Sequence, residues 1–136
     1  MGTTLVTGGM GFIGKYLVKK ILTETTDSIV IVDNLSSSVI DETLINNNRV
    51  SFINRNFEDF EPEIKLDKIY HLTSPVGPLG VLKHKGKIGK LIIEQLYHAA
   101  FMAIEHNAKL VEISTSEVYG AHPESEEIGQ PETLNM

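Results

Sequence analysis

One segment, TGGMGFIG at positions 7–14, constrains the fold of this chain more than any other feature. It follows a short apolar, β-branched run at positions 3–7. Its last three residues begin a second stretch, residues 12–22, whose apolar side chains recur with helical spacing. The glycines are therefore expected in a turn between a buried parallel strand and a helix. Such a turn requires glycine for its tight bend, for close approach of a pyrophosphate, and for close packing of the helix.

The glycine spacing satisfies both G-x-G-x-x-G (positions 9–14) and G-x-x-G-x-x-G (positions 8–14). A second apolar run, residues 28–32, leads into Asp33, nineteen residues after Gly14. A carboxylate at this spacing can accept hydrogen bonds from an adenosine ribose, while the helix N-terminus offers free N–H groups to phosphate. This order of strand, glycines, helix, strand and acid favours dinucleotide binding over a glycine-rich turn with a solvated Asp.

Composition excludes several other classes of protein. The 136 residues form one domain by length, and 41% hydrophobic and 22% charged residues are ordinary for a globular chain. The absence of cysteine excludes disulfides, a thiolate metal site and a cysteine nucleophile, and it suits the cytoplasm. No metal site of another kind is expected. A net charge of −6 argues against a nucleic-acid partner, and no apolar run is long enough to cross a membrane.

The rest of the chain alternates between apolar runs and helical patterns. Further strands are expected at 50–53, 68–72 and 110–114. A short helix or turn is expected at 41–47, and a long helix from residue 81 or 87 to 106. Residues 54–63 and 73–80 are expected to be loops. The buried stripe of the long helix is expected to comprise Ile88, Leu91, Ile92, Leu96, Ala99, Ala100 and Ala103. The alternation predicts an α/β fold with a doubly wound parallel sheet in the order 3-2-1-4-5, which binds ligands at the carboxyl ends of its strands.

Four segments together carry a resemblance to a known family: TGGMGFIG at 7–14, VDNLSSS at 32–38, YHLTSP at 70–75 and ISTSEVYG at 113–120. With them the chain resembles the extended short-chain dehydrogenase/reductase family, the NAD-dependent epimerases and dehydratases of nucleotide sugars. The last two segments look most like those of UDP-glucuronate decarboxylases and sugar 4,6-dehydratases. The resemblance covers the whole chain. It implies that residues 1–136 are a Rossmann-type NAD-binding domain, incomplete because the family continues with further strands and a substrate domain.

The resemblance also implies a role for individual residues. Expected NAD contacts are Gly8, Gly11, Phe12, Ile13 and Gly14 at the pyrophosphate, Asp33, Asn34 and Ser37 at the adenosine ribose, Asn56 and Phe57 at the adenine edge, and Leu72, Thr73 and Ser74 along the middle of the cofactor. Thr115 matches the family's catalytic hydroxyl, and Ser116 and Glu117 match its acid–base pair. Hydride transfer leaves a developing ketone, whose oxygen needs hydrogen-bond donors. Without the other motifs, a polar strand exit would be favoured for Thr115 and Ser116 and a solvated acid for Glu117; with those motifs, the catalytic roles are favoured.

The chain departs from the family pattern in several places. The family's catalytic Tyr-x-x-x-Lys is missing, since no Tyr follows Tyr119 and no Lys follows Lys109. Tyr16 and Lys20 match that spacing formally, but on the first helix, away from the nicotinamide. Ile92 stands where the family has an Asn. The basic loop 77–89, which contains Lys83, His84, Lys85 and Lys87, fits either substrate phosphates or a solvated loop.

These observations lead to two hypotheses of different class. The first is the NAD-binding portion of a nucleotide-sugar epimerase, dehydratase or decarboxylase, with a nucleotide sugar as the substrate of the whole protein. The second is a non-catalytic NAD-binding sensor or partner module; a mononucleotide or flavin binder fits Asp33 less well. NAD is expected rather than NADP, because Asp33 repels a 2′-phosphate and no Arg or Lys lies at 34–41. An exposed edge at the fifth strand would invite a homodimer.

Overall fold

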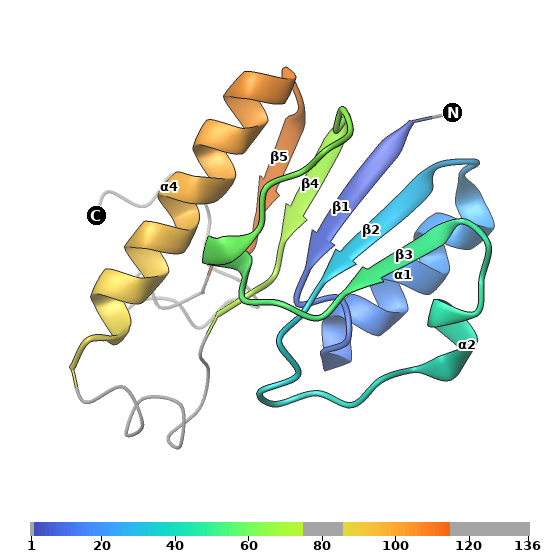
Figure 1. Ribbon diagram of the computed structural model, residues 1–136, viewed down its shortest axis with the longest axis horizontal. Coiled ribbons are helices and arrows are strands. Elements are labelled where there is room, and N and C mark those ends of the chain that lie inside the picture. The colour runs from blue at the N-terminus through green and yellow to red at the C-terminus, as the bar shows by residue number, and fades with distance from the viewer. Residues whose placement is uncertain (1, 75–85, 115–136) are drawn as a thin grey trace, which may run out of the picture.

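The computed structural model describes residues 2–74 and 86–114, which form one parallel five-stranded sheet in the order β3-β2-β1-β4-β5 (Figure 1). The elements are β1 (Thr3–Thr7), α1 (Phe12–Glu24), β2 (Ser28–Val32), α2 (Glu42–Ile45), β3 (Val50–Ile53), the 3₁₀ turn η1 (Phe57–Asp59), β4 (Lys68–His71), α4 (Ile88–His106) and β5 (Lys109–Glu112). The doubly wound α/β fold and its strand order are thereby confirmed.

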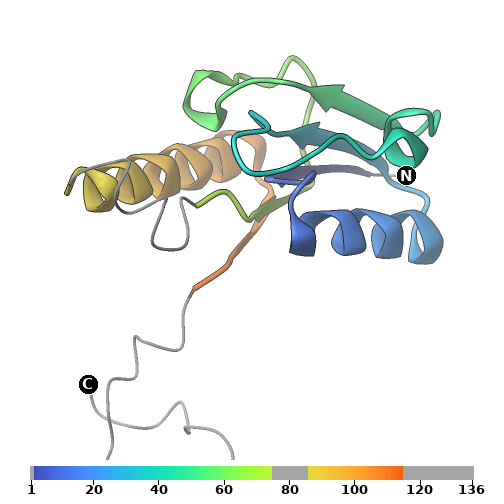
Figure 2. The same cartoon turned by 90° about the horizontal axis from the view of Figure 1, so that it is seen from below.

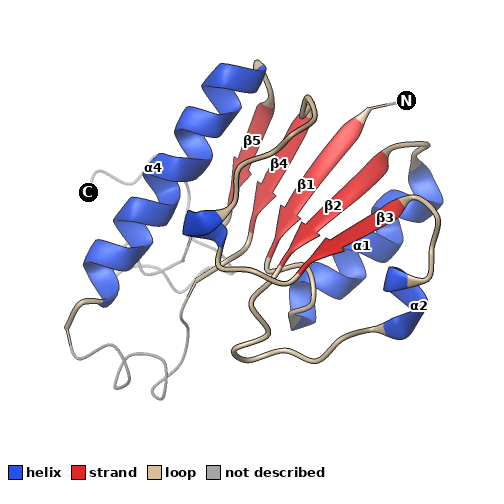
Figure 3. Ribbon diagram, viewed as in Figure 1, coloured by secondary structure: helices blue, strands red, loops and turns tan. Residues whose placement is uncertain are grey.

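The sheet separates two apolar clusters, one on each face. Successive residues of β1 point to opposite faces, so Leu5 joins the cluster under α4 and η1, whereas Val6 joins the cluster under α1 and α2. Seen from below, α1 and α4 lie on opposite sides of the sheet (Figure 2), and α4 runs beside β4 and β5 (Figure 3). The central strands β1 and β2 are buried along nearly their whole length. This explains why the central strands read as continuous apolar runs.

Some predicted boundaries differ from the observed ones by a few residues. Helix α1 continues to Glu24, β4 ends at His71, and β5 comprises Lys109–Glu112 instead of 110–114. The long helix begins at Ile88, close to the later of the two expected starts. Among the described helices, none combines the length and apolar character needed to cross a bilayer.

The predicted buried stripe of α4 is wrong in part. Ile92 and Leu96 are exposed, while Gln95 and Met102 are buried together with Ala99 and Ala103. The helix is apolar around most of its circumference, so periodicity alone could not select the face that meets the sheet. Ile13 of α1 is likewise exposed, and the buried residues of that helix are Gly14, Val18 and Ile21.

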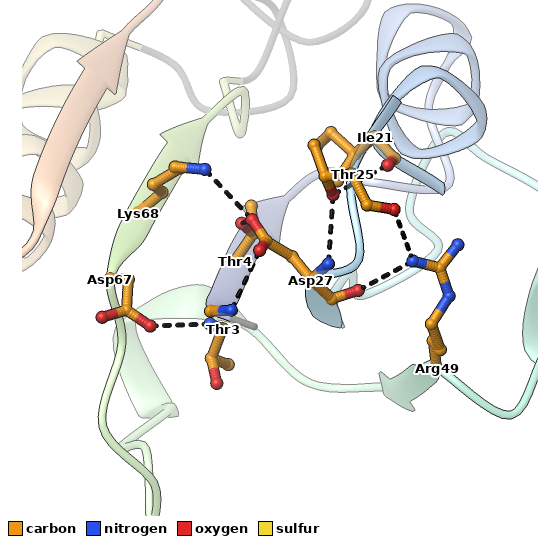
Figure 4. A network of polar contacts seen from close by, with 9 residues as sticks. Thr3, Thr4, Ile21, Thr25, Asp27, Arg49, Asp67 and Lys68 are labelled. Carbon is orange, nitrogen blue, oxygen red and sulfur yellow. Dashed lines mark hydrogen bonds and ion pairs between the residues drawn. The ribbon is translucent and has the colours of Figure 1, made fainter. Parts of the chain in front are cut away.

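Charged side chains join the amino ends of the strands in the network of Figure 4. The buried Asp27 carboxylate accepts hydrogen bonds from the Gly2 N–H at 3.0 Å and the Thr4 hydroxyl at 3.1 Å, and pairs with the Lys68 ammonium at 3.1 Å. The hydrogen bond from the Gly2 N–H is the main cause that holds the pKa of Asp27 below its usual range, and the hydrogen bond from Lys68 is the second. Arg49 donates to the carbonyls of Leu22, Thr25 and Asp27, and so caps the C-terminal end of α1.

Asp27→Ala is expected to lower the free energy of unfolding by about 2 kcal/mol at neutral pH, because two donors lose their buried acceptor. The pKa of Asp27 is lowered in the folded state, so its contribution is present above its ordinary pKa of 3.8 and is lost as pH falls below that value. Urea titration of parent and variant from pH 7 to pH 3 measures both effects. The matched control is Asp67→Ala, which removes one acceptor, that of the Thr3 N–H, at an exposed site. Equal losses in the two variants would contradict the prediction.

Candidate dinucleotide site

The carboxyl ends of the strands meet at one edge of the sheet. Thr7 is the register partner of both Val32 and His71, and Val32 in turn pairs with Ile53. The segments that leave β1, β2, β3 and β4 therefore start side by side (Figure 1). Most of the residues singled out from the sequence follow these strands, so the fold gathers them at the edge where parallel sheets bind ligands.

The glycine turn brings α1 into contact with the end of β1. Gly8 has a positive φ of 65°, and its N–H donates to the Val32 carbonyl at 2.8 Å. A Cβ on Gly14 would lie 2.3 Å from the Gly8 carbonyl oxygen, so no side chain fits between helix and turn. A Cβ on Gly11 would meet the Gly8 oxygen at 3.1 Å and, within residues 2–74 and 86–114, no other group within 4 Å. The turn is closed toward the sheet and open on its outer side.

The open side of the turn is suited to an anion. Gly11 is the N-cap of α1 and has no side chain over the helix end. The first amides of an α-helix, here those of Phe12 and Ile13, have no partners within the helix. Together with the helix dipole, they can bind a pyrophosphate. The side chains of Phe12 and Ile13 are exposed, and it is their backbone amides that can donate to the anion.

Asp33 is buried and is held in place on both carboxylate oxygens. Oδ2 accepts the Met10 N–H at 2.9 Å, while Oδ1 accepts the Leu35 N–H at 2.8 Å and the Ser38 hydroxyl at 2.9 Å. Leu35 adopts a left-handed conformation, with φ of 58°, in this turn. A carboxylate offers about four acceptor positions. Asp33 thus ties the glycine turn to the end of β2 and keeps capacity for a ribose hydroxyl.

The loops after β2 and β3 are joined beside Asp33. Asn34 donates from Nδ2 to Oδ1 of Asn56 at 2.9 Å, and Asn56 contacts Asp59 at 3.3 Å. Ser37 is exposed and forms no hydrogen bond to Asp33; the neighbouring Ser38 does, although the sequence did not single it out. The Phe57 ring is 2% exposed and packs in the core, so only its backbone is available to an adenine.

A hollow of about 360 Å³ lies against the outer side of the glycine turn. Its lining is Met10, Gly11, Phe12, Lys15, Tyr16, Lys19, Ser37, Ser38 and Val39. The two lysines come from α1 and lie beside Ser37 and Ser38, although the segment 34–41 itself contains no Arg or Lys. Lys19 pairs with Asp41 at 3.0 Å; hydrogen bonds from Thr43, and then Lys19, lower the pKa of Asp41 to about 2.

The remaining residues singled out from the sequence fall into three groups. Leu72 and Thr73 are half-buried and lie against the Gly8 turn, while Ser74 is exposed at the end of the described segment. Thr115, Ser116 and Glu117 lie outside the described residues, as do Lys83, His84 and Lys85 of the basic loop; Lys87 is exposed. Tyr16 and Lys20 are exposed on α1, where Lys20 pairs with Glu24 at 3.4 Å.

The sequence reading also missed a buried polar pair. The Thr7 hydroxyl and Nδ1 of His71 are 2.8 Å apart at the ends of β1 and β4. Burial, with a smaller effect of the nearby His98, lowers the pKa of His71 to about 4. The signal was present in the sequence, since both residues are polar positions inside apolar strand runs.

This fold and edge define a dinucleotide-binding α/β protein. The NAD dependent epimerase/dehydratase family matches residues 4–135, and the chain belongs to that family. The glycine cradle, which a side chain at position 14 would fill, and the anchored Asp33 fit NAD, the family's cofactor. Among the described residues, no cluster of His, Asp and Glu is arranged to hold a metal ion.

Three known proteins illustrate how similar the chain is to its relatives and how much of their length it covers. UDP-glucuronic acid decarboxylase 6 of Arabidopsis thaliana is 32% identical over 90% of this chain, which spans 37% of that protein. The dTDP-glucose 4,6-dehydratase of Escherichia coli is 31% identical over 97% of this chain and 42% of its own length. The dehydratase DesIV of Streptomyces venezuelae, solved with NAD bound, shares the fold with a TM-score of 0.81 at 20% identity, covering 98% of this chain and 45% of that one. The chain thus spans less than half of these proteins.

Gly14→Ala is expected to lower the free energy of unfolding by more than about 2 kcal/mol, because its Cβ has no room beside the Gly8 and Gly9 backbone. Gly11→Ala adds the same methyl group on the open side of the turn and is expected to cost less than about 1 kcal/mol. Thermal and urea denaturation of the two variants compare these effects. A Gly14→Ala protein as stable as Gly11→Ala would show that α1 is not seated against the turn.

Proposed function

We propose that this chain binds NAD at the carboxyl edge of its sheet, as the cofactor-binding part of an enzyme that epimerises, dehydrates or decarboxylates a nucleotide sugar. The observation that carries the proposal is the link from Asp33 to the Met10 N–H at 2.9 Å, which joins the ribose acceptor to the phosphate cradle. Family membership and the substrates of the relatives support the reaction class.

Each part of the edge has a proposed role in holding the cofactor. Gly8, Gly11 and Gly14 form the cradle, in which the Phe12 and Ile13 amides donate to the pyrophosphate. Asp33 accepts from the ribose, with Asn34, Ser37, Asn56 and the Phe57 backbone around the adenosine. Leu72, Thr73 and Ser74 line the middle of the cofactor. When bound, NAD supplies transient acceptance of a hydride from the sugar.

The substrate end of the site is proposed from the family resemblance. Thr115 would donate a hydrogen bond to the reacting sugar oxygen, while Ser116 and Glu117 would move protons on the carbon skeleton. An alcohol has no accessible ionised form near neutral pH, so Thr115 does not replace a Tyr base. These 136 residues alone are expected to bind NAD without turning over a nucleotide sugar. The proposed compartment is the cytoplasm, which a cysteine-free chain suits.

The second candidate is a non-catalytic NAD-binding sensor or partner module. For the 136 residues taken by themselves it is favoured by one observation, that their Tyr-x-x-x-Lys spacing is met by Tyr16 and Lys20 of α1. Assay of the protein as its gene encodes it discriminates between the two. Turnover of UDP-glucuronate or dTDP-glucose by that protein supports the enzyme, and NAD binding without turnover supports the module.

NAD is expected to bind more tightly than NADP, because the Asp33 carboxylate bonds a ribose diol but repels a 2′-phosphate. Charge-assisted hydrogen bonds of this kind contribute about 1.5–3 kcal/mol, which corresponds to a preference of at least tenfold. Lys15 and Lys19 in the adjacent hollow make the comparison informative, since they oppose this preference. Calorimetric titration with both cofactors measures it, and Gly11→Val serves as the control with a blocked cradle. Equal or tighter NADP binding, or unchanged NAD binding by Gly11→Val, would contradict the site.

We also propose that the chain pairs with a second copy through α4 and the adjoining edge strand β5. Large apolar side chains of α4 are exposed, among them Tyr97 and Phe101, whose rings stack with centroids 6.4 Å apart. Sedimentation velocity at rising concentration is expected to reveal a dimer that Phe101→Glu dissociates. Tyr16→Glu, a matched change of an exposed aromatic side chain on α1, across the sheet from α4, is the control. A parent chain that stays monomeric at every concentration would refute the pairing.

A further inference from the structure

A single buried hydroxyl connects the two walls of the proposed cofactor site. Thr7 is the last residue of β1 and is 0% exposed. Its Oγ1 lies 2.8 Å from Nδ1 of His71 and receives the backbone N–H groups of Leu72 at 3.1 Å and Thr73 at 3.2 Å. The hydroxyl thus stands between the start of the glycine turn and the segment that leaves β4.

The Thr7 hydroxyl donates its proton to His71 and accepts from the two backbone N–H groups. A hydroxyl has one proton to donate and two lone pairs to accept with. The N–H groups of Leu72 and Thr73 occupy both lone pairs of Thr7 Oγ1. The hydroxyl proton is therefore donated to His71, so Nδ1 of His71 is the acceptor and the ring proton lies on Nε2.

The surroundings of His71 keep its ring neutral. The ring is 3% exposed and packs against the Phe57 ring at 4.9 Å, with His98 of α4 on another side of Phe57 at 4.8 Å. Burial is the main cause that lowers the pKa of His71 to about 4. On β5 its register partner is Glu112, whose own pKa burial raises; on η1, Glu58 is exposed and accepts from Gln95. Beside His71, β1 contributes only the uncharged Thr7.

The segment held by Thr7 is in contact with the phosphate cradle. A Cβ on Gly8 would lie 3.3 Å from the Leu72 carbonyl carbon and 3.3 Å from the Thr73 nitrogen. The position of Leu72 and Thr73 therefore sets how close the β4 exit stands to the glycine turn. If either N–H lost its acceptor inside this contact, the segment would have to move to find another.

We propose that His71 is a positioning residue for NAD: by accepting the Thr7 hydroxyl proton, it reserves the hydroxyl oxygen for the N–H groups of Leu72 and Thr73 and so fixes the β4 exit against the glycine turn. This inference rests on the proposed NAD binding. A protonated His71 cannot accept that proton. Three donors would then face one hydroxyl oxygen, and the β4 exit would separate from the turn.

Two substitutions separate the acceptor from the packing of the ring. His71→Asn keeps an acceptor, Oδ1, near the position of Nδ1, whereas His71→Leu keeps apolar volume and removes the acceptor. His71→Leu is expected to weaken NAD binding about tenfold, and His71→Asn by less than about threefold. The matched control is His98→Leu, which removes the other imidazole beside Phe57, hydrogen-bonded to the Phe60 carbonyl, and should leave NAD affinity unchanged.

Three readouts accompany calorimetric NAD titration. Amide exchange at Leu72 and Thr73 should accelerate about tenfold in His71→Leu without NAD, and not in His98→Leu. The ¹⁵N spectrum of the parent should show an unprotonated Nδ1. NAD affinity of the parent should stay level near pH 6.5 and fall as pH is lowered through about 4, the lowered pKa of His71 in the folded protein. The last two need no variant, so they hold even if His71→Leu does not fold.

The outcomes distinguish the two proposals. A parent chain that does not bind NAD refutes the proposed function and, with it, this role of His71. A parent that binds NAD, together with a His71→Leu variant that binds equally well, overturns the positioning role alone. The role is also overturned if His71→Asn loses as much affinity as His71→Leu, or if Nδ1 carries the proton.

Discussion

The contact between Gly14 and the Gly8 carbonyl is the constraint on which the rest of the structure depends. It lets α1 start directly above the end of β1, because neither partner has a side chain in the gap. From that start, Val18 and Ile21 reach the core on one face of the sheet. The same seating directs the amides of the first helical turn to the carboxyl edge, so packing and phosphate recognition have a common origin.

The two ends of the sheet use charge differently. At the amino end, Asp27 is paired with Lys68, and Arg49 caps α1, so the charges are satisfied within the protein and serve stability. At the carboxyl end, Asp33 is anchored by neutral donors, which orient its carboxylate without neutralising it. Within the described residues, the Asp33 carboxylate is oriented by hydrogen bonds without a cationic partner. This arrangement is expected of a binding group, since a ligand can still donate to the carboxylate.

The opposite face of the sheet is organised around aromatic and imidazole rings instead of glycines. Phe57 separates His71 from His98 and fills the space between η1, α4 and β4. Leu72, which follows β4, packs on the other face, in the cluster under α1. Both faces of the sheet thus contribute to a single edge: the end of β4 contacts the core under α4 through His71 and Phe57, and the residue that follows it contacts the core under α1.

The sequence by itself determined the order of the elements, the parallel sheet and the glycine turn, because each depends on local periodicity or on the freedom of glycine. It also identified Asp33, whose spacing from the glycines is a property of the chain. Only the tertiary structure decided which face of α4 is buried, since that helix is apolar on most sides. Only packing revealed the Thr7–His71 pair and the lysines beside Ser37, because residues distant in sequence meet there through the strand register and the seating of α1.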